Sequence, residues 1–310
     1  MQEQDQRAGE VVFGGIEGGG TKFVVMVGSG PDRIVDEAQF PTTTPQETLG
    51  RVVRFFQTPR EGVRVAAVGV SSFGPIEPGR SSPEYGYITT TPKQGWAHTD
   101  VVGVLRRALG VPVGWDTDTN GAAFGERRWG AGKDIDPLFY ITVGTGIGGG
   151  GLVDGRPLHG LLHPEIGHLP VPVYDGDTFP GVCPFHGRCL EGVASGPALR
   201  ARVGRPAQEL VPNDPVWDLE ARYLAAGFYS IVLTLSPRRI IVGGGVAGVP
   251  GLLDRVGRYM VSLNNGYVSR PALTDEGIGA YLVRPGLGSR SGVLGALELA
   301  RMAYEETGGS

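Results

Sequence analysis

The segment 183–189, with the sequence CPFHGRC, contains the residue types that bind zinc. It holds both cysteines of the chain, with His186 between them. A structural zinc site takes four thiolate or imidazole ligands in a tetrahedron. His168 is the candidate to complete the set with Cys183, His186 and Cys189, and His163 is the alternative. The competing interpretation is two free cysteines beside an exposed histidine. Two cysteines cannot form a disulfide framework, and their close spacing favours a metal.

Asp118 is the candidate catalytic carboxylate. It stands in the run DTDTN at 116–120, just before the small-residue helix start at Gly121. An aspartate at this place can cap the helix by accepting a backbone N–H. It can also accept the proton of an attacking hydroxyl, as in kinase chemistry. One residue can have both roles. With an ordinary pKa of about 3.9, it would be ionised at neutral pH.

Glycine is unusually abundant, with 53 of 310 residues, about 17%, where about 7% is usual. Three glycine clusters follow strand-like runs, at 18–20, 144–151 and 243–245. The backbone N–H groups of a tight glycine turn can form an anion site. Three such clusters in one chain favour a phosphate-rich ligand, a nucleotide, over plain tight hairpins.

Two of these clusters match the spacing G-x-G-x-x-G but not its context. A dinucleotide site needs a helix directly after the turn and an acidic residue about 20 positions further on. The match at 144–149 runs into another strand, and the match at 243–248 has no acidic residue near 268–270. Lys22 follows Thr21, the reverse of the order in a Walker P-loop. A nicotinamide-dependent oxidoreductase is therefore disfavoured.

Charge and hydropathy exclude other classes. The chain has 28 basic and 32 acidic residues, a net charge of −4, without the basic excess typical of nucleic-acid binding. No apolar run approaches the ~20 residues of a membrane-spanning helix. The N-terminus MQEQDQRAGE lacks the apolar core of a signal peptide. We therefore expect a cytoplasmic protein that binds neither nucleic acid nor membrane.

Hydrophobic periodicity predicts an α/β protein. We expect a hairpin of strands at 11–16 and 23–27, and a long loop at 78–96. The two halves each begin with a strand and a glycine turn, which suggests a duplicated core. Further strands are predicted at 65–70, 138–143 and 239–242, and helices from 45, at 101–109, from 215, from 250 and at 292–304.

Taken together, these motifs resemble the ROK (repressor, ORF, kinase) family of sugar kinases, and within it the bacterial fructokinase branch. The resemblance runs from about residue 11 to about 304. It rests on a phosphate hairpin at 14–23, sugar-side loops at 72–76 and 85–93, the aspartate segment at 116–120, a sugar-and-zinc motif at 164–168 with the CPFHGRC cluster, and adenosine-side motifs at 235–237 and 243–246.

The resemblance implies a two-lobe actin-like ATPase (RNase H-like) fold of the α/β class, with ATP and sugar in the cleft between lobes. The lobes would span 11–118 and 119–290, with a C-terminal helix at 291–310 returning to the first lobe. The implied activity is ATP-dependent phosphorylation of D-fructose to fructose 6-phosphate. Mannose or glucose are the alternative substrates, and a sugar-sensing protein without catalysis is the alternative function. Mg²⁺ would accompany ATP, Zn²⁺ would be structural, and a homodimer is common in relatives.

The resemblance also implies residue roles. Asp118 would orient and deprotonate the sugar hydroxyl. The ATP side would comprise Gly19, Gly20, Thr21, Lys22, Thr145, Gly146, Pro197, Gly243, Gly244, Gly245, Val246 and Ala247. The sugar side would comprise Gly74, Pro75, Asp118, Glu165, His168 and Glu191, and zinc would be bound by His168, Cys183, His186 and Cys189.

The chain departs from the family pattern at a few positions. The wider family usually has aspartate where Glu17 stands, whereas glutamate fits the fructokinase branch, and Gly18 stands where alanine is more usual. Ser289, in the run SRS at 289–291, replaces a usual aspartate, which leaves this loop without an assigned role. Only about ten polar residues precede the first strand, so we expect no DNA-binding domain of the repressor branch.

Overall fold

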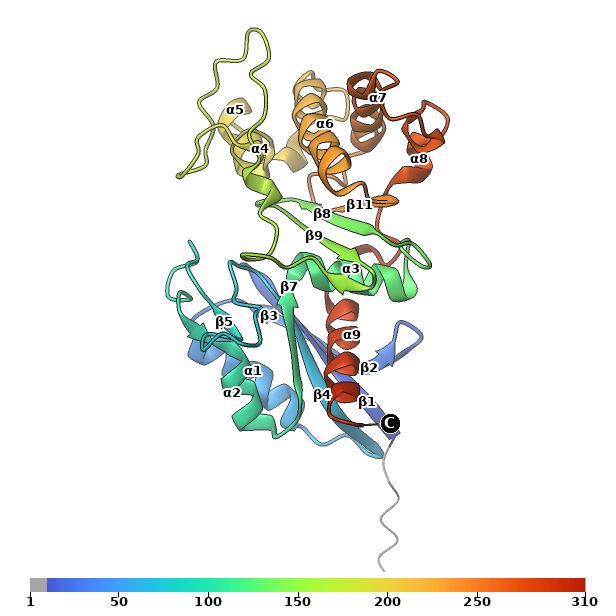
Figure 1. Cartoon of the computed structure of the whole chain (residues 1–310). Helices are drawn as coiled ribbons and strands as arrows, with labels where there is room; N and C mark the ends of the chain where they lie inside the picture. Colours follow the sequence, from blue (N-terminus) through green and yellow to red (C-terminus); the bar gives the residue numbers. More distant parts are fainter. Residues whose placement is uncertain (1–9, 310) are drawn as a thin grey trace, which may run out of the picture. The chain divides into compact units, whose positions relative to one another are not determined.

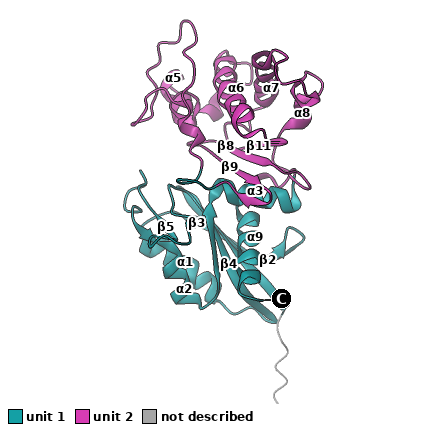
Figure 2. Cartoon of the chain, in the orientation of Figure 1, with its two compact units in different colours: residues 1–130, 159–163, 290–310 teal, residues 131–158, 164–289 magenta. Residues whose placement is uncertain are grey.

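The computed structural model describes residues 10–309, which form two compact units. Unit 1 comprises 10–130, 159–163 and 290–309, and unit 2 comprises 131–158 and 164–289 (Figure 2). The division falls after Gly130, not after Asp118, because the helix that begins at Asp118 packs against the C-terminal helix, which is also in unit 1.

Unit 1 is built on a five-stranded sheet of order β3-β2-β1-β4-β7 (Figure 1). Strands β1 and β2 are antiparallel, whereas β1, β4 and β7 are parallel. One face is covered by α1 and α2, whose apolar residues join those of the sheet in one core. The strands are β1 (Glu10–Gly18), β2 (Lys22–Gly30), β3 (Arg33–Pro41), β4 (Val63–Ser72) and β7 (Val113–Thr117), and the helices are α1 (Pro45–Gln57), α2 (Val101–Leu109), α3 (Asp118–Trp129) and α9 (Ser291–Glu306).

Helix α9 lies unusually close to the sheet and to α3 because glycines occupy the contacts. A Cβ on Gly69 of β4 would lie 2.0 Å from the carbonyl oxygen of Ala296. A Cβ on Gly295 would lie 1.6 Å from the carbonyl oxygen of Gly121 in α3. Part of the glycine excess therefore serves close helix packing in unit 1. The prediction of phosphate binding applies to the glycines of the three turns and not to these packing glycines.

We expect Gly295→Ala to lower the melting temperature, although alanine is the better helix former by about 1 kcal/mol. The added methyl group meets backbone, and overpacking of this kind costs about 1–3 kcal/mol. Gly279→Ala is the matched control, since a Cβ there meets nothing within 4 Å. Scanning calorimetry of both variants is the measurement, and equal melting temperatures for the two would contradict the close approach.

Unit 2 repeats the topology of unit 1. Its sheet has the order β10-β9-β8-β11-β12, so in each unit the strands follow the same order along the chain, third-second-first-fourth-fifth. The duplicated core is confirmed. The strands are β8 (Leu138–Val143), β9 (Ile147–Val153), β10 (Arg156–Pro157), β11 (Arg239–Gly243) and β12 (Leu282–Val283), and the helices are α4 (Leu190–Ala194), α5 (Gly196–Val203), α6 (Val216–Leu235), α7 (Leu252–Asn264) and α8 (Ile278–Tyr281).

Most predicted elements are present, with three differences. The strand β3 was not predicted, although its burial alternates along the chain as expected of an edge strand. Helix α3 begins at Asp118, three residues before the predicted start at Gly121, because Thr117 caps it. The loop at 78–96 contains a two-residue strand, β5 (Tyr87–Ile88), paired with β6 (Thr99–Asp100). Among residues 10–309, no helix combines the length and the apolar character needed to cross a bilayer.

Candidate active site

The carboxyl ends of three parallel strands meet at one edge of the unit 1 sheet. Gly18 of β1 is in register with Ser72 of β4, and Ser72 is in register with Thr117 of β7. The chain leaves these strands into the glycine hairpin, the loop after residue 72 and Asp118, respectively. Ligands of α/β sheets bind at such an edge. The sheet therefore gathers the predicted residues of unit 1: Gly19, Gly20, Thr21, Lys22, Gly74, Pro75 and Asp118.

Asp118 is the first residue of α3 and not its cap. The cap is Thr117, whose Oγ1 accepts the backbone N–H of Asn120 at 3.1 Å. Asp118 Oδ1 accepts the backbone N–H of Thr119 at 2.8 Å. Burial raises the pKa of Asp118 to about 6, and the hydrogen bond from Thr119 acts against this rise. The ordinary pKa assumed from sequence is therefore wrong, and Asp118 is a better proton acceptor than an exposed aspartate.

Glu17 is a second carboxylate of this site, and it was not among the predicted site residues. Burial raises its pKa to about 7, and the charge of Asp118 adds to the rise. The carboxylate lies against the start of α9, where a Cβ on Gly292 would lie 2.5 Å from its Cδ. The signal in the sequence was one acidic residue inside a run of glycine and apolar residues, GGIEGGG.

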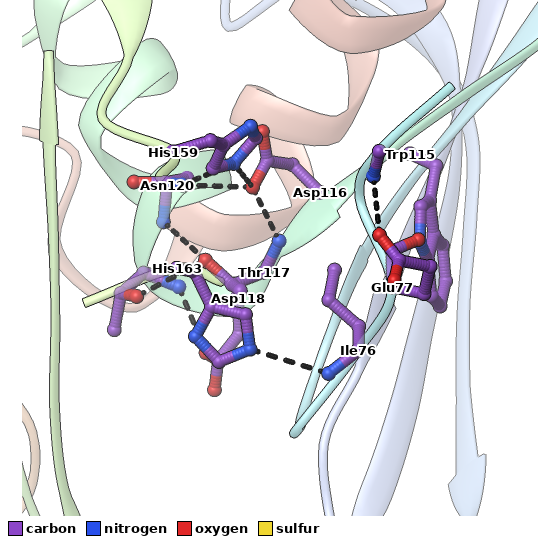
Figure 3. Close-up of polar contacts among 11 residues, drawn as sticks. Ile76, Glu77, Trp115, Asp116, Thr117, Asp118, Asn120, His159 and His163 are labelled. Atoms are coloured by element: carbon purple, nitrogen blue, oxygen red, sulfur yellow. Dashed lines mark hydrogen bonds and ion pairs between the residues drawn. The ribbon is translucent and has the colours of Figure 1, made fainter. Parts of the chain in front are cut away.

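Asp116, two residues before Asp118, is buried in a hydrogen-bond network (Figure 3). Its Oδ1 accepts from the backbone N–H of Thr117 and from Asn120 Nδ2, both at 2.8 Å. His159 Nε2 lies 3.1 Å from the same oxygen. Burial alone would lower the pKa of His159, but the hydrogen bond and charge of Asp116 outweigh burial and raise it. The turn from β7 into α3 is thus held by its own side chains and by His159, which is about 40 residues further along the chain.

The loop that carries Gly74 and Pro75 is held on two sides. The carbonyl oxygen of Pro75 accepts the backbone N–H of Thr89 at 2.9 Å and its hydroxyl at 3.1 Å. On the other side, the backbone N–H of Ile76 donates to His163 Nε2 at 3.2 Å (Figure 3). The two predicted sugar-side loops are therefore joined within unit 1.

The hairpin at 18–22 is a tight turn with an open outer side. The backbone N–H of Gly19 donates to the carbonyl oxygen of Lys22 at 2.9 Å, and Thr42 Oγ1 donates to that of Gly19 at 2.7 Å. A Cβ on Gly20 would meet nothing within 4 Å. Lys22 Nζ donates to Gln39 Oε1 at 3.4 Å. The backbone at Gly20 is therefore exposed and open to an anion.

Unit 2 brings its own predicted nucleotide residues together. The carbonyl oxygen of Gly144 accepts the N–H of Gly196 at 2.8 Å, and that of Val143 accepts the N–H of Val246 at 3.0 Å. Gly244 has φ +95° and its Cβ would lie 2.3 Å from the carbonyl oxygen of Val143, so only glycine fits there. These contacts gather the turn after β8, the start of α5 and the loop after β11, which contain Thr145, Gly146, Pro197, Gly243, Gly244, Gly245, Val246 and Ala247.

The predicted sugar residues of unit 2 lie around the glycine turn and the short helix at 166–168. Glu191 Oε2 accepts the backbone N–H of Ile147 at 2.9 Å, and a Cβ on Gly146 would lie 2.7 Å from the same oxygen. Glu165 precedes the helix, and its carbonyl oxygen accepts the N–H of His168 at 3.0 Å. Glu191 is therefore bound to the predicted nucleotide turn, a link that sequence spacing did not reveal.

Four side chains of unit 2 form a metal-ligand cluster: His168, Cys183, His186 and Cys189, with ligand atoms all within 4.8 Å of one another. Cys183 Sγ lies 3.7 Å from Nδ1 of both His168 and His186, and Cys189 Sγ lies 3.5 Å from His168 Nδ1. Tetrahedral zinc, with bonds of about 2.3 Å to sulfur and 2.0 Å to nitrogen, separates such atoms by about 3.6 Å. The cluster fits zinc, and it contains His168, not His163.

Arg188 ties the same loop to the body of unit 2. Its guanidinium donates to Asp177 Oδ2 at 3.1 Å and to the Tyr223 hydroxyl at 2.8 Å. Arg202 also donates to Asp177, at 2.5 Å. Burial alone would raise the pKa of Asp177, but the hydrogen bonds from Arg202 and Tyr223 outweigh burial and hold it far below its usual range. The metal cluster is thus not the loop's only attachment.

The segment at 289–291 has structural partners in unit 1. Arg290 pairs with Glu37 at 2.8 Å, and Ser291 Oγ donates to Glu126 Oε1 at 2.7 Å. Both contacts secure the start of α9, the helix whose first residues lie against Glu17. This part of the chain therefore supports the site although it lacks the expected aspartate.

The ROK family profile matches residues 13–303. The chain belongs to the ROK family. A fructokinase of Zymomonas mobilis subsp. mobilis is 44% identical, over 94% of this chain and 97% of its own length. A putative fructokinase of Bacillus subtilis is 42% identical, over 95% of this chain and 97% of its own length.

Solved structures of ROK proteins have the same fold. The ROK hexokinase from Thermus thermophilus has a TM-score of 0.77 at 28% identity, over 95% of this chain and 99% of that one. A ROK family glucokinase from Streptomyces griseus, in complex with glucose and AMPPNP, has a TM-score of 0.74 at 26% identity, over 94% and 99%. The predicted α/β fold of the actin-like ATPase type and the resemblance to the ROK family are both confirmed.

Proposed function

We propose that this ROK protein transfers the γ-phosphoryl group of ATP to a free hexose, with D-fructose as the preferred substrate and fructose 6-phosphate as the product. The observation that carries the proposal is Asp118, a carboxylate of raised pKa at the strand edge that also holds the glycine hairpin and the loop of Gly74 and Pro75. The fructokinases at 42 and 44% identity support the choice of sugar, and the glucokinase bound to glucose and AMPPNP supports binding of ATP and a sugar.

In the proposed reaction, Asp118 accepts the proton of the sugar's 6-hydroxyl as that oxygen bonds to the γ-phosphorus. The bond from the γ-phosphorus to the β–γ bridging oxygen breaks, and ADP leaves with the bond's electrons. Because the transition state is loose, positioning and charge neutralisation supply most of the catalysis. The hairpin at 18–22 and the glycine turns of unit 2 would bind the phosphates and adenosine.

Two metal ions belong to the proposal. Mg²⁺ would arrive with ATP. Glu17, just before the glycine hairpin, is the carboxylate of this site that could contact the ion. Zinc would bind His168, Cys183, His186 and Cys189, and with four protein ligands it would be structural. Since Nδ1 of His168 faces the cluster, Nε2 remains to bind a sugar hydroxyl beside Glu165 and Glu191.

The test is ADP release with MgATP and fructose, mannose, glucose or N-acetylmannosamine, assayed side by side. We expect the highest kcat/KM with fructose. Preference for another hexose would keep the kinase mechanism and overturn the choice of substrate. Sugar binding without ADP release, from folded zinc-loaded protein, would support a sensing protein instead. The homodimer and the cytoplasmic location remain predictions, and light scattering of the purified protein tests the first.

The raised pKa of Asp118 predicts an acid limb in the pH profile. The base must be ionised to accept the hydroxyl proton, so kcat/KM for the sugar should fall about tenfold per pH unit below about pH 6. An aspartate of ordinary pKa would place the fall near pH 4. Initial rates at saturating MgATP from pH 4.5 to 8 provide the measurement. A kcat/KM that stays level from pH 7 down to pH 5 would contradict the raised pKa, and Asp118→Asn should lose the limb altogether.

A further inference from the structure

A five-residue segment of unit 1 comes from the middle of unit 2 in the sequence. Residues 159–163 group with unit 1, whereas 131–158 and 164–289 group with unit 2. The segment, HGLLH, begins and ends with histidine. Each histidine bonds a different piece of the unit 1 site (Figure 3). Neither side chain is among the residues proposed above to bind the sugar, ATP or a metal.

His163 holds the loop of Gly74 and Pro75 through a backbone hydrogen bond. Its Nε2 accepts the N–H of Ile76 at 3.2 Å, and the side chain is buried, with 9% exposed. The ring also lies against Gly74, where an added Cβ would be 3.5 Å from Nε2 and Cε1. A buried backbone N–H left without its partner is unfavourable, so loss of this acceptor should loosen the loop.

His159 holds the other piece, the turn that carries Asp118. Its Nε2 lies 3.1 Å from Asp116 Oδ1, and Asn120 Nδ2 lies 3.3 Å from the same nitrogen. Asp116 is the second-last residue of β7, and Asn120 is in the first turn of α3, so the contact spans Asp118 in the sequence. A hydrogen bond donated by His159 stabilises the negative charge of the buried Asp116 carboxylate, in addition to those from Thr117 and Asn120.

We propose that His159 and His163 are positioning residues for phosphoryl transfer: His163 fixes the sugar-side loop at 74–76, and His159 fixes the turn that aims Asp118 at the sugar hydroxyl. This rests on the proposed function for its kinetic consequences. The hydrogen bonds themselves can be tested without activity. A displacement of about 1 Å at a catalytic group can cost about 10²-fold in rate, which sets the size of effect to expect.

Hydrogen exchange tests the His163 contact directly. His163→Leu removes the acceptor, whereas His163→Gln places an amide oxygen near the position of Nε2. We expect the amide of Ile76, read by mass spectrometry of a peptide covering 73–77, to exchange at least tenfold faster in His163→Leu than in the wild type. In His163→Gln it should exchange within about threefold of the wild type. Equal exchange in all three proteins would overturn the role of His163.

Steady-state kinetics separate positioning from general stability. His163→Leu should raise KM for the sugar about tenfold with little change in KM for ATP, and His163→Gln should restore it. His159→Leu should lower kcat about 10- to 100-fold with sugar KM nearly unchanged, and His159→Gln, which retains a donor, should recover most of kcat. Leu161→Ala, in the same segment and fully exposed, is the control expected to behave as wild type.

The outcomes distinguish this inference from the proposed function. If the wild type phosphorylates none of the hexoses, the proposed function fails, and the exchange of Ile76 still decides whether His163 holds the loop. If the wild type is active, unchanged sugar KM in His163→Leu or unchanged kcat in His159→Leu overturns the positioning role of that residue. Equal losses in the leucine and glutamine variants, or parallel losses in Leu161→Ala, would show a structural role only and also overturn it.

Discussion

Asp118→Asn is expected to lower kcat for hexose phosphorylation by about 10²- to 10⁴-fold, the usual contribution of a general base. Asparagine keeps an oxygen to accept the N–H of Thr119, and the helix cap is Thr117, so α3 should still begin where it does. The change removes only the carboxylate oxygen that we propose takes the hydroxyl proton. KM values for sugar and ATP should therefore change far less than kcat.

The control for Asp118→Asn is an aspartate outside the site, whose replacement removes one negative charge and no contact of the site. Asp134 is exposed and has φ +59°, a conformation that asparagine tolerates well, so Asp134→Asn should have wild-type kinetics. Single-turnover assays of Asp118→Asn would show whether the chemical step itself is slowed. A kcat within a few-fold of wild type would remove Asp118 from the role of base.

Loss of a ligand of the proposed zinc site is the second large effect we expect. His186→Asn is the sharpest variant because His186 is exposed, while the two cysteines are buried, so the substitution leaves no cavity. Replacing a residue that hydrogen-bonds to a metal ligand lowers metal affinity about 10- to 100-fold. Replacing a ligand itself should lower zinc affinity on the order of 10²-fold or more. Metal analysis after dialysis against graded chelator provides the measurement.

The effect of zinc loss on activity depends on which residues lie next to the metal-ligand cluster in the chain. His168 is a member of the cluster, and Glu165 precedes it by one short helical turn, so zinc loss should raise KM for the sugar more than KM for ATP. Arg188 and Asp177 still hold the loop, so unit 2 should remain folded at 25 °C. His98→Asn is the control, since His98 is exposed and outside the cluster. Wild-type protein with less than about half an equivalent of zinc would count against a zinc site.

Local patterns in the sequence determined much of this protein. The Thr44 cap, the proline after it and the helical spacing placed α1, and runs of β-branched residues placed β4, β8 and β11. These features act over a few neighbouring residues, so they are legible without the fold. The spacing of Cys183, His186 and Cys189 likewise predicted three members of the metal-ligand cluster, because a loop of seven residues keeps its ends close.

Other features depended on residues far apart in the sequence. Glycines at 69 and 295 are packing residues only because α9, from the end of the chain, returns to the sheet of unit 1. The pKa of Asp118 is raised by burial, which no spacing reveals. From sequence, His168 was the candidate for the fourth zinc ligand and His163 the alternative, since both precede the cysteines. Only the folded chain sends His163 to Ile76 and His168 to the cysteines, because five residues between 158 and 164 pack with unit 1 while the rest of that region packs with unit 2.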